Sequence, residues 1–83
     1  MTNAQEWLDS TYPLESRESV KAISASGKGL VGALKITGFP NLIDLHLNSN
    51  QLTKVDVWEC SKLIYLTLYD NPLQEPPFTF LES

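Results

Sequence analysis

The stretch LIDLHLNSNQL at positions 42–52 returns as LIYLTLYDNPL at positions 63–73, which is a period of 21 residues. Both copies keep four leucines and one asparagine at the same places. A fixed period of this length indicates repeated supersecondary units that bury their apolar faces against one another. Stacked units of this kind leave a regular exposed face, and such a face usually binds a partner.

A degenerate copy of the same repeat precedes these two, over residues 20–30. It holds Val20, Ile23, Ala25 and Leu30 at the leucine positions, whereas Lys28 replaces the asparagine. Terminal repeats are often atypical. We therefore divide the centre of the chain into repeats at residues 20–41, 42–62 and 63–73, of which the last is partial.

The segments that connect the repeats also match one another. Leu34 and Ile36 alternate with other residues as Val55 and Val57 do, which is the period of a half-buried strand. None of these segments has the length or the period of a full helix. We expect each coil to carry its main strand over the Leu-x-Leu stretch and a shorter extended piece on the opposite, convex side.

The N-terminal residues 1–19 depart from the repeat and are predicted to form a helical cap. Thr2 or Asn3 is placed to cap a short helix over residues 4–9. Tyr12-Pro13 should end that helix, because a residue before proline disfavours the helical region. Trp7 and Leu8 would then lie over the open end of the first coil.

The C-terminal residues 74–83 depart from the repeat as well. Pro76 and Phe78 stand where Val55 and Val57 would recur, with Pro77 between them. Two adjacent prolines cannot donate ladder hydrogen bonds, so the array is expected to stop here. We predict that this tail caps the last coil through its apolar residues, which are Phe78, Phe80 and Leu81.

The composition limits the functions open to the chain. Its 83 residues suffice for one small domain, and 42% hydrophobic with 19% charged residues is typical of a packed chain. The net charge of -4 argues against a nucleic-acid surface. No stretch has the pattern of a secretory signal or the length of a membrane span. The single cysteine, Cys60, permits no internal disulfide, so we expect a cytoplasmic protein without cofactor or metal.

The repeat motifs resemble those of leucine-rich repeat proteins over Val20 to Leu73. The first half of the chain further resembles the N-terminal cap of fungal leucine-rich repeat proteins. There, a Trp-Leu helix and a Tyr-Pro stop precede a first coil of the form K-x-L-x-G-x-L-x-x-x-G-F-x-N-L. The matching residues are Trp7, Leu8, Tyr12, Pro13, Lys28, Leu30, Gly32, Leu34, Gly38, Phe39, Asn41 and Leu42.

This resemblance implies a leucine-rich repeat solenoid that is mostly β. It implies about three short coils, one parallel concave sheet and a short N-terminal helical cap. Some proteins of that group also carry a protein kinase domain, but no kinase motif is present in this sequence. The resemblance therefore implies a binding or scaffold role and no enzymatic activity.

Strand alternation predicts which side chains face outward from the concave sheet. They form three columns, which are Ala22, Asp44 and Tyr65, then Ser24, His46 and Thr67, then Ser26, Asn48 and Tyr69. Tyrosines offer a large contact area at a low entropy cost, which suits a binding hot spot. The predicted protein-binding residues are Asp44, His46, Asn48, Tyr65, Thr67 and Tyr69. The alternative is a solvated sheet face whose aromatic residues are incidental.

An enzymatic alternative uses the same face. Asp44, His46 and a hydroxyl from Ser24 or Thr67 would supply an acid, a base and a nucleophile. The sequence specifies no oxyanion donors, and an exposed sheet offers no pocket that excludes water. A non-enzymatic role is therefore the prediction.

Four further residues receive structural predictions. Asn50 and Asn71 follow the main strands and are expected to pair the backbone groups of each bend. Cys60 takes the place of Phe39 in the next coil and is expected to be a buried core residue rather than a reactive thiol. Trp58 is expected to be partly exposed and to cover a coil edge, with a second contact surface as the alternative.

Together these features predict a non-enzymatic module that binds a protein partner through its concave face. The alternative is a structural or assembly fragment of a longer repeat protein that pairs through its open ends. Self-association through the C-terminal edge belongs to that alternative. Neither nucleic acid nor a membrane is expected as a partner.

Overall fold

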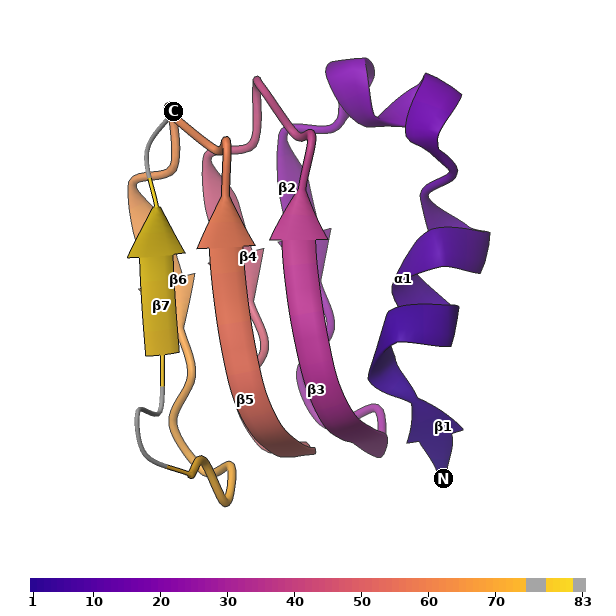
Figure 1. Ribbon diagram of the computed structural model, residues 1–83, viewed down its shortest axis with the longest axis vertical. Helices are drawn as coiled ribbons and strands as arrows, with labels where there is room; N and C mark the ends of the chain where they lie inside the picture. The colour runs from indigo at the N-terminus through magenta and orange to yellow at the C-terminus, as the bar shows by residue number, and fades with distance from the viewer. Residues whose placement is uncertain (75–77, 82–83) are drawn as a thin grey trace.

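Two parallel β-sheets lie face to face in the computed structural model of the chain (Figure 1). The structure describes residues 1–74 and, as backbone, residues 78–81. One sheet has four strands in the order β1-β3-β5-β7, and the other has three in the order β2-β4-β6. The bounds are β1 (Thr2–Asn3), β2 (Ala22–Ser24), β3 (Leu30–Thr37), β4 (Asp44–His46), β5 (Gln51–Trp58), β6 (Tyr65–Thr67) and β7 (Phe78–Leu81).

The predicted fold class, a leucine-rich repeat solenoid with one main concave sheet, is wrong. The segments expected to be short convex pieces are the long strands β3 and β5, with eight residues each. The strands over the Leu-x-Leu stretches, β2, β4 and β6, have three residues each. The chain therefore alternates between two separate sheets, and the larger sheet lies on the side that was expected to be convex.

A β-bulge explains why the long strands are hidden in the sequence. The register between β3 and β5 shifts between Gly32 and Ala33, so that Thr53 is an extra residue in β5. Leu52 and Val55 are both buried although they stand an odd number of positions apart. Simple alternation therefore does not reveal that they belong to one strand.

The core fills the space between the sheets. Its fully buried side chains come from both sheets, their connections and the N-terminal helix, and they are Ala4, Leu8, Ile23, Ala25, Leu30, Leu34, Ile36, Phe39, Leu42, Leu45, Leu47, Leu52, Val55, Val57 and Cys60. The leucines of the last repeat pack against this core but stay partly exposed, and they are Leu63, Leu66, Leu68 and Leu73. One end of the core is therefore less well covered than the other.

The helix α1 (Ala4–Thr11) covers the other end. Its N-cap is Asn3, whose Oδ1 accepts a hydrogen bond of 3.0 Å from the backbone N–H of Glu6. The helix ends before Tyr12-Pro13, so the predicted helix and its stop are confirmed, with an end two residues later than expected. A 3-10 helix, η1 (Leu14–Ser19), follows and leads into β2.

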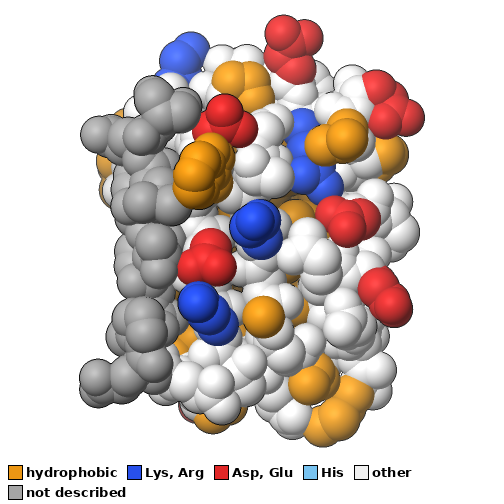
Figure 2. Space-filling model, in the orientation of Figure 1, with side chains coloured by type: hydrophobic (Ala, Val, Ile, Leu, Met, Phe, Trp, Pro, Cys, Tyr) orange, Lys and Arg blue, Asp and Glu red, His pale blue; other side chains and the backbone are white. Residues whose placement is uncertain are grey.

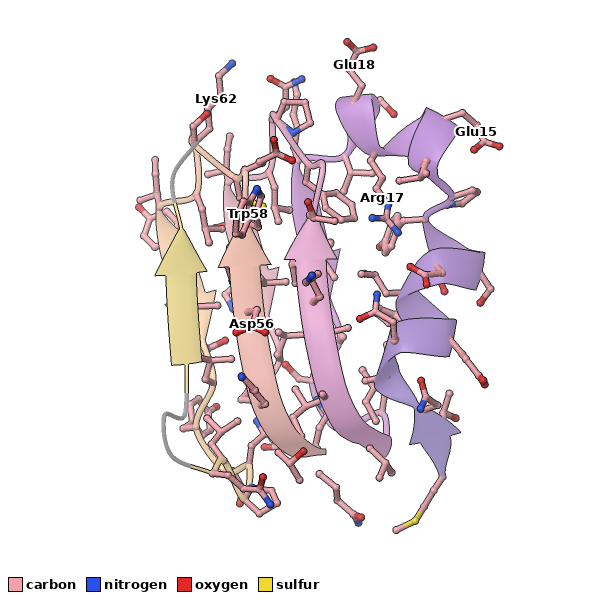
Figure 3. The ribbon with its side chains drawn as sticks, viewed as in Figure 1. Glu15, Arg17, Glu18, Asp56, Trp58 and Lys62 are labelled. Carbon is pink, nitrogen blue, oxygen red and sulfur yellow. The ribbon has the colours of Figure 1, made fainter. Side chains whose placement is uncertain are left out.

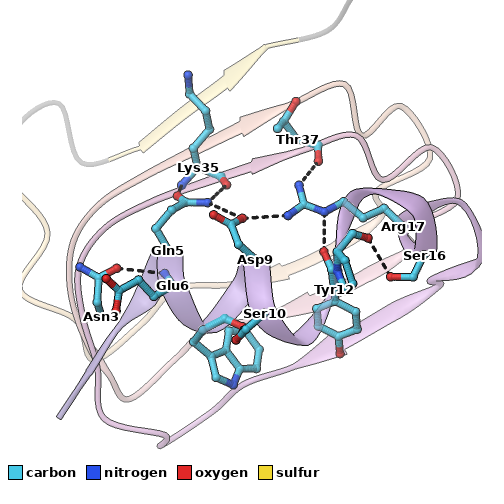
Figure 4. Close-up of polar contacts among 12 residues, drawn as sticks. Asn3, Gln5, Glu6, Asp9, Ser10, Tyr12, Ser16, Arg17, Lys35 and Thr37 are labelled. Atoms are coloured by element: carbon cyan, nitrogen blue, oxygen red, sulfur yellow. Dashed lines mark hydrogen bonds and ion pairs between the residues drawn. The ribbon is translucent and has the colours of Figure 1, made fainter.

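The outer edge of β3 is closed by this N-terminal segment (Figure 4). β1 pairs with the start of β3, and the Gln5 side chain then continues the ladder. It accepts from the backbone N–H of Lys35 at 2.7 Å and donates to the carbonyl of the same residue at 3.2 Å. The edge therefore keeps few unpaired groups, which protects it against pairing with another strand.

Arg17 closes the last part of the same edge and is 3% exposed. Its Nη1 donates to the carbonyl of Thr37 at 2.9 Å, and its Nε donates to the carbonyl of Tyr12 at 2.8 Å. Nη2 forms an ion pair of 2.9 Å with Asp9, and the guanidinium carbon lies 4.8 Å from the centre of the Phe39 ring. One side chain therefore ties α1, the Tyr12 turn and β3 together.

The C-terminal strand β7 pairs in parallel with β5, with Phe78 opposite Val55 and Phe80 opposite Val57. The expectation that the two prolines end the array is therefore wrong for the backbone, because a strand follows them. The predicted packing of the side chains of Phe78, Phe80 and Leu81 on the last coil lies outside the described residues. No helix in the described part of the chain combines the length and the apolar character that crossing a bilayer requires.

A left-handed backbone recurs at the end of each long strand, at Gly38 (φ 77°) and at Glu59 (φ 58°). A Cβ added at Gly38 meets no atom within 4 Å, so the conformation alone sets the cost of a substitution. We expect Gly38→Ala to lower the free energy of unfolding by about 1–2 kcal/mol. Gly38→Asn, which tolerates this region better, should cost less, and urea denaturation measures both. Equal midpoints for the two variants and the parent would contradict this account.

Candidate binding surface

The outer face of the β2-β4-β6 sheet carries the predicted columns of side chains. The strand pairings place Ala22, Asp44 and Tyr65 in one row and Ser24, His46 and Thr67 in the next, so these two columns are confirmed. The third column continues beyond the strands, where Ser26 Oγ donates to Asn48 Oδ1 at 2.8 Å. The backbone N–H of Ser49 donates to the carbonyl of Tyr69 at 3.0 Å, which holds Tyr69 beside Asn48. The structure therefore brings all six predicted binding residues onto one surface.

A chain of hydrogen bonds runs across this surface from β6 to β4. Thr67 Oγ1 donates to Asn48 Oδ1 at 3.2 Å, and His46 Nδ1 lies 2.8 Å from Thr67 Oγ1. In the contact between His46 and Thr67, either Nδ1 or the hydroxyl donates, according to the tautomer of the histidine.

The structure brings only part of the predicted acid, base and nucleophile together. Thr67 Oγ1 lies within hydrogen-bond distance of His46 Nδ1. Among the described residues, Asp44 makes no hydrogen bond to His46, so the third member of the predicted set is not joined to the other two. A surface pocket lies elsewhere, at the N-terminal end of the chain, and is lined by Met1, Thr2, Asn3, Val31 and Gly32.

Three large apolar side chains stand exposed on and beside β6. Tyr65 is 59% exposed and Tyr69 is 67% exposed, and Ile64 between the strand and its preceding turn is 68% exposed. Asp44, next to Tyr65 in the same row, is half-buried. Ile64 was not among the predicted binding residues, although an isoleucine, Ile43, occupies the equivalent position of the preceding repeat. The surface therefore combines rigid aromatic area with a fixed polar network.

The two asparagines at the bends make the contacts expected of them. Asn50 is 8% exposed, and its Oδ1 accepts from the backbone N–H groups of Lys28 at 3.0 Å and Leu30 at 3.1 Å. Its Nδ2 donates to the carbonyls of Ala25 and Leu47, each at 2.9 Å, and to that of Asn48 at 3.2 Å. These bonds join the end of one sheet to the start of the other.

Asn71 repeats the arrangement one coil later and is partly exposed. Its Oδ1 accepts from the backbone N–H of Leu52 at 3.0 Å. Its Nδ2 donates to the carbonyl of Leu47 at 2.9 Å, to that of Leu68 at 3.0 Å and to that of Tyr69 at 3.4 Å. The carbonyl of Leu47 is therefore shared by both asparagines, which form a ladder along the bends.

Cys60 is 1% exposed and belongs to the core, as predicted. Burial raises the pKa of its thiol, a hydrogen bond from the backbone of Phe39 lowers it, and the charge of Glu59 raises it again. The net direction is upward from the ordinary value of a free cysteine. The thiol therefore stays protonated and enclosed where an exposed cysteine begins to ionise.

We expect Cys60 to react slowly with a thiol-specific reagent at pH 8 in the native protein. The reaction should accelerate by at least about tenfold in denaturing urea, because the thiolate is the reactive form and unfolding restores its pKa. Absorbance of the released chromophore measures both rates. Native labelling as fast as that of the unfolded chain would show that the thiol is accessible.

The outer face of the four-stranded sheet has a different character (Figure 2). Lys35 stands opposite Asp56, and Thr37 opposite Trp58, so charged residues occupy its centre. Asp56 and Trp58 project from β5 toward the viewer in Figure 3. Trp58 is 42% exposed, as predicted, but it lies on an inner strand rather than at an edge, because β3 and β7 flank it.

The described residues contain no group of three or more His, Cys, Asp and Glu side chains that could hold a metal ion. Comparison of the chain with protein-family models, with curated proteins and with solved structures gave no match.

Proposed function

We propose that the chain is a non-enzymatic protein-interaction module. Its binding surface is the outer face of the β2-β4-β6 sheet, centred on Tyr65 and Tyr69. One observation carries the proposal, which is the exposure of these two tyrosines, 59% and 67%, one on the short strand β6 and the other just after it. Exposed aromatic residues held on a rigid scaffold bind proteins at a low entropy cost.

The polar side chains beside the tyrosines support this assignment. His46, Asn48 and Thr67 are already joined by hydrogen bonds, so a partner would meet donors and acceptors that are held in place. Side chains ordered before binding lose less entropy when the complex forms. The face of the other sheet, with Lys35, Lys54 and Asp56, offers charged groups at its centre, and interface centres are depleted in charge.

Affinity capture with matched variants tests the proposal. The immobilised chain should retain a protein from a cell extract. The double variant Tyr65→Ala, Tyr69→Ala should retain at least about tenfold less of that protein. Trp58→Ala is the control, because Trp58 is also an exposed aromatic residue but lies on the opposite sheet. A protein lost with Trp58→Ala and kept with the tyrosine variant would place the binding surface on the four-stranded sheet.

We further propose that the module acts in the cytoplasm. The support is its single cysteine, which is buried and has no partner in the chain with which to form a disulfide. Imaging of a fluorescent fusion in cells of the source organism tests this location, and fluorescence confined to another compartment would contradict it.

A further inference from the structure

The strand β6 is an edge of its sheet, and only the backbone groups on one of its sides form hydrogen bonds to a neighbouring strand. In a parallel ladder alternate residues direct both backbone groups to the same side. Tyr65 N–H donates to Ile43 O at 3.0 Å, and Thr67 O accepts from Leu47 N–H at 2.9 Å, so these residues face β4. The backbone N–H groups of Leu66 and Leu68 therefore face away from β4, and no strand of the described residues pairs with them.

The side chains of this edge are apolar and uncharged. Residues 63–69 read LIYLTLY, without charge, proline or glycine. The preceding repeat has Asp44 and His46 where this one has Tyr65 and Thr67. Leu66 and Leu68 are partly exposed, whereas their equivalents Leu45 and Leu47 are fully buried.

Other edges of the same molecule are treated differently. The outer edge of β3 is closed by β1, by the Gln5 amide and by Arg17, so this chain does cover an edge with its own residues. Proteins usually protect an open edge with charges, proline or a covering element. The β6 edge carries neither a charge nor a proline in its own sequence, which indicates that another strand covers it.

We propose that the β6 edge is the dimerisation site of this protein and that its occupant is β6 of a second copy. The two strands run antiparallel about a two-fold axis at Thr67. Leu66 then exchanges both backbone hydrogen bonds with Leu68 of the other copy, so both outward-facing residues are used. Tyr65 stands opposite Tyr69 of the other copy on the outer face, and the two partly exposed leucine rows cover each other.

Head-to-tail pairing of β6 with β2 of a second copy fits less well. At the β2 edge the core residues Ile23 and Ala25 are already fully buried. In that arrangement the partly exposed leucines of β6 would pack against an edge that has no partly exposed apolar row of its own. The two-fold arrangement buries both rows, and closed two-fold dimers are the commonest assemblies.

The expected affinity is modest. An aromatic side chain offers about 150–250 Å², so two tyrosines exposed by 59% and 67% contribute at most about 250 Å² per copy. Ile64 and the leucine row add to this area, which stays near or below the ~800 Å² per partner of a standard interface. We therefore expect dissociation at about micromolar concentration. Each copy carries a net charge of -4, so added salt should strengthen the dimer by screening.

Sedimentation equilibrium of the purified chain tests the proposal with paired charge variants. In Tyr65→Lys, Tyr69→Lys like charges face each other across the axis, and the dimer should weaken by at least about tenfold. In Tyr65→Lys, Tyr69→Glu opposite charges face each other, and the dimer should be kept. Ala22→Lys, on the other edge of the same sheet, is the control and should have no effect. A monomer at all concentrations, equal behaviour of the two double variants, or loss of the dimer in Ala22→Lys would each overturn the proposal.

A cross-link tests the register directly. Residues opposite each other at a two-fold axis without mutual hydrogen bonds have Cα atoms about 4.5 Å apart, which suits a disulfide. In a Cys60→Val background, Thr67→Cys should form a covalent dimer at least about tenfold faster than Ser24→Cys under mild oxidation. Equal rates would overturn the two-fold arrangement. This inference rests on the backbone edge and not on the proposed function, since both experiments use the purified chain without a partner.

Discussion

Replacement of Arg17 by methionine should lower the free energy of unfolding by about 3–4 kcal/mol, because it leaves buried acceptors without donors. The carbonyls of Tyr12 and Thr37 lose the hydrogen bonds that the guanidinium donates to them. Methionine fills a similar space, so the loss reports mainly on the bonds. Urea denaturation followed by tryptophan fluorescence measures it.

Two matched variants separate the geometry of Arg17 from its charge. Arg17→Lys keeps the charge, but one ammonium group cannot reach three acceptors, so it should lose about 2 kcal/mol. Asp9→Asn should cost under about 1 kcal/mol, because the Asp9 side chain is 57% exposed and its ion pair is screened. If Asp9→Asn cost as much as Arg17→Met, the ion pair and not the backbone contacts would be the source of the stability.

Asn50→Leu should be at least as damaging, with a loss of about 4 kcal/mol or more. The substitution removes five hydrogen bonds and leaves two backbone donors and the Ala25 carbonyl unpaired at the bends. The carbonyls of Leu47 and Asn48 keep the bonds that Asn71 and Gly27 donate to them. Each buried unpaired group costs about 1–3 kcal/mol. Such a loss approaches the whole stability of a small domain, so thermal unfolding by circular dichroism should show a greatly lowered Tm.

The other bend residue provides a graded comparison. Asn71→Leu should cost less than Asn50→Leu, because Asn71 is partly exposed and water can reach the groups it serves. Thr67→Val, on the outer face, should change the free energy of unfolding by about 1 kcal/mol or less. A Thr67→Val variant as unstable as Asn50→Leu would mean that the bends do not hold the two sheets together.

The 21-residue period was enough to predict the small sheet and its outer face. Regular spacing sets which residues share a row, and therefore Asp44, His46, Tyr65 and Thr67 stand where the pattern puts them. The helix over Ala4–Thr11 was also predictable, since a cap and a proline are local signals. These features depend on short stretches of sequence.

The large sheet was not predictable in the same way, because its long strands contain a bulge at Thr53. An extra residue changes the face of everything that follows it, so the alternation is interrupted there. The pairing of β7 was missed for a related reason. Phe78 lies opposite Val55, a separation of 23 residues rather than 21, and a strict period therefore misplaces it.

The role of Arg17 left no signal in the sequence. A lone arginine in LESRES resembles a solvated surface residue, and arginine is rarely buried. Its acceptors lie at Asp9, Tyr12 and Thr37, and only the folded chain brings them together. Partners that are distant in sequence and include backbone carbonyls cannot be inferred from residue type.

The measurement that tests the central claim most directly is a nuclear magnetic resonance titration of the labelled chain with the protein that it captures. We predict that the backbone signals of His46, Tyr65, Thr67 and Tyr69 shift or broaden first, and that Lys35, Lys54 and Trp58 on the opposite sheet stay unchanged. Perturbations confined to Lys35, Lys54 and Trp58 would contradict the assignment of the β2-β4-β6 face as the binding surface.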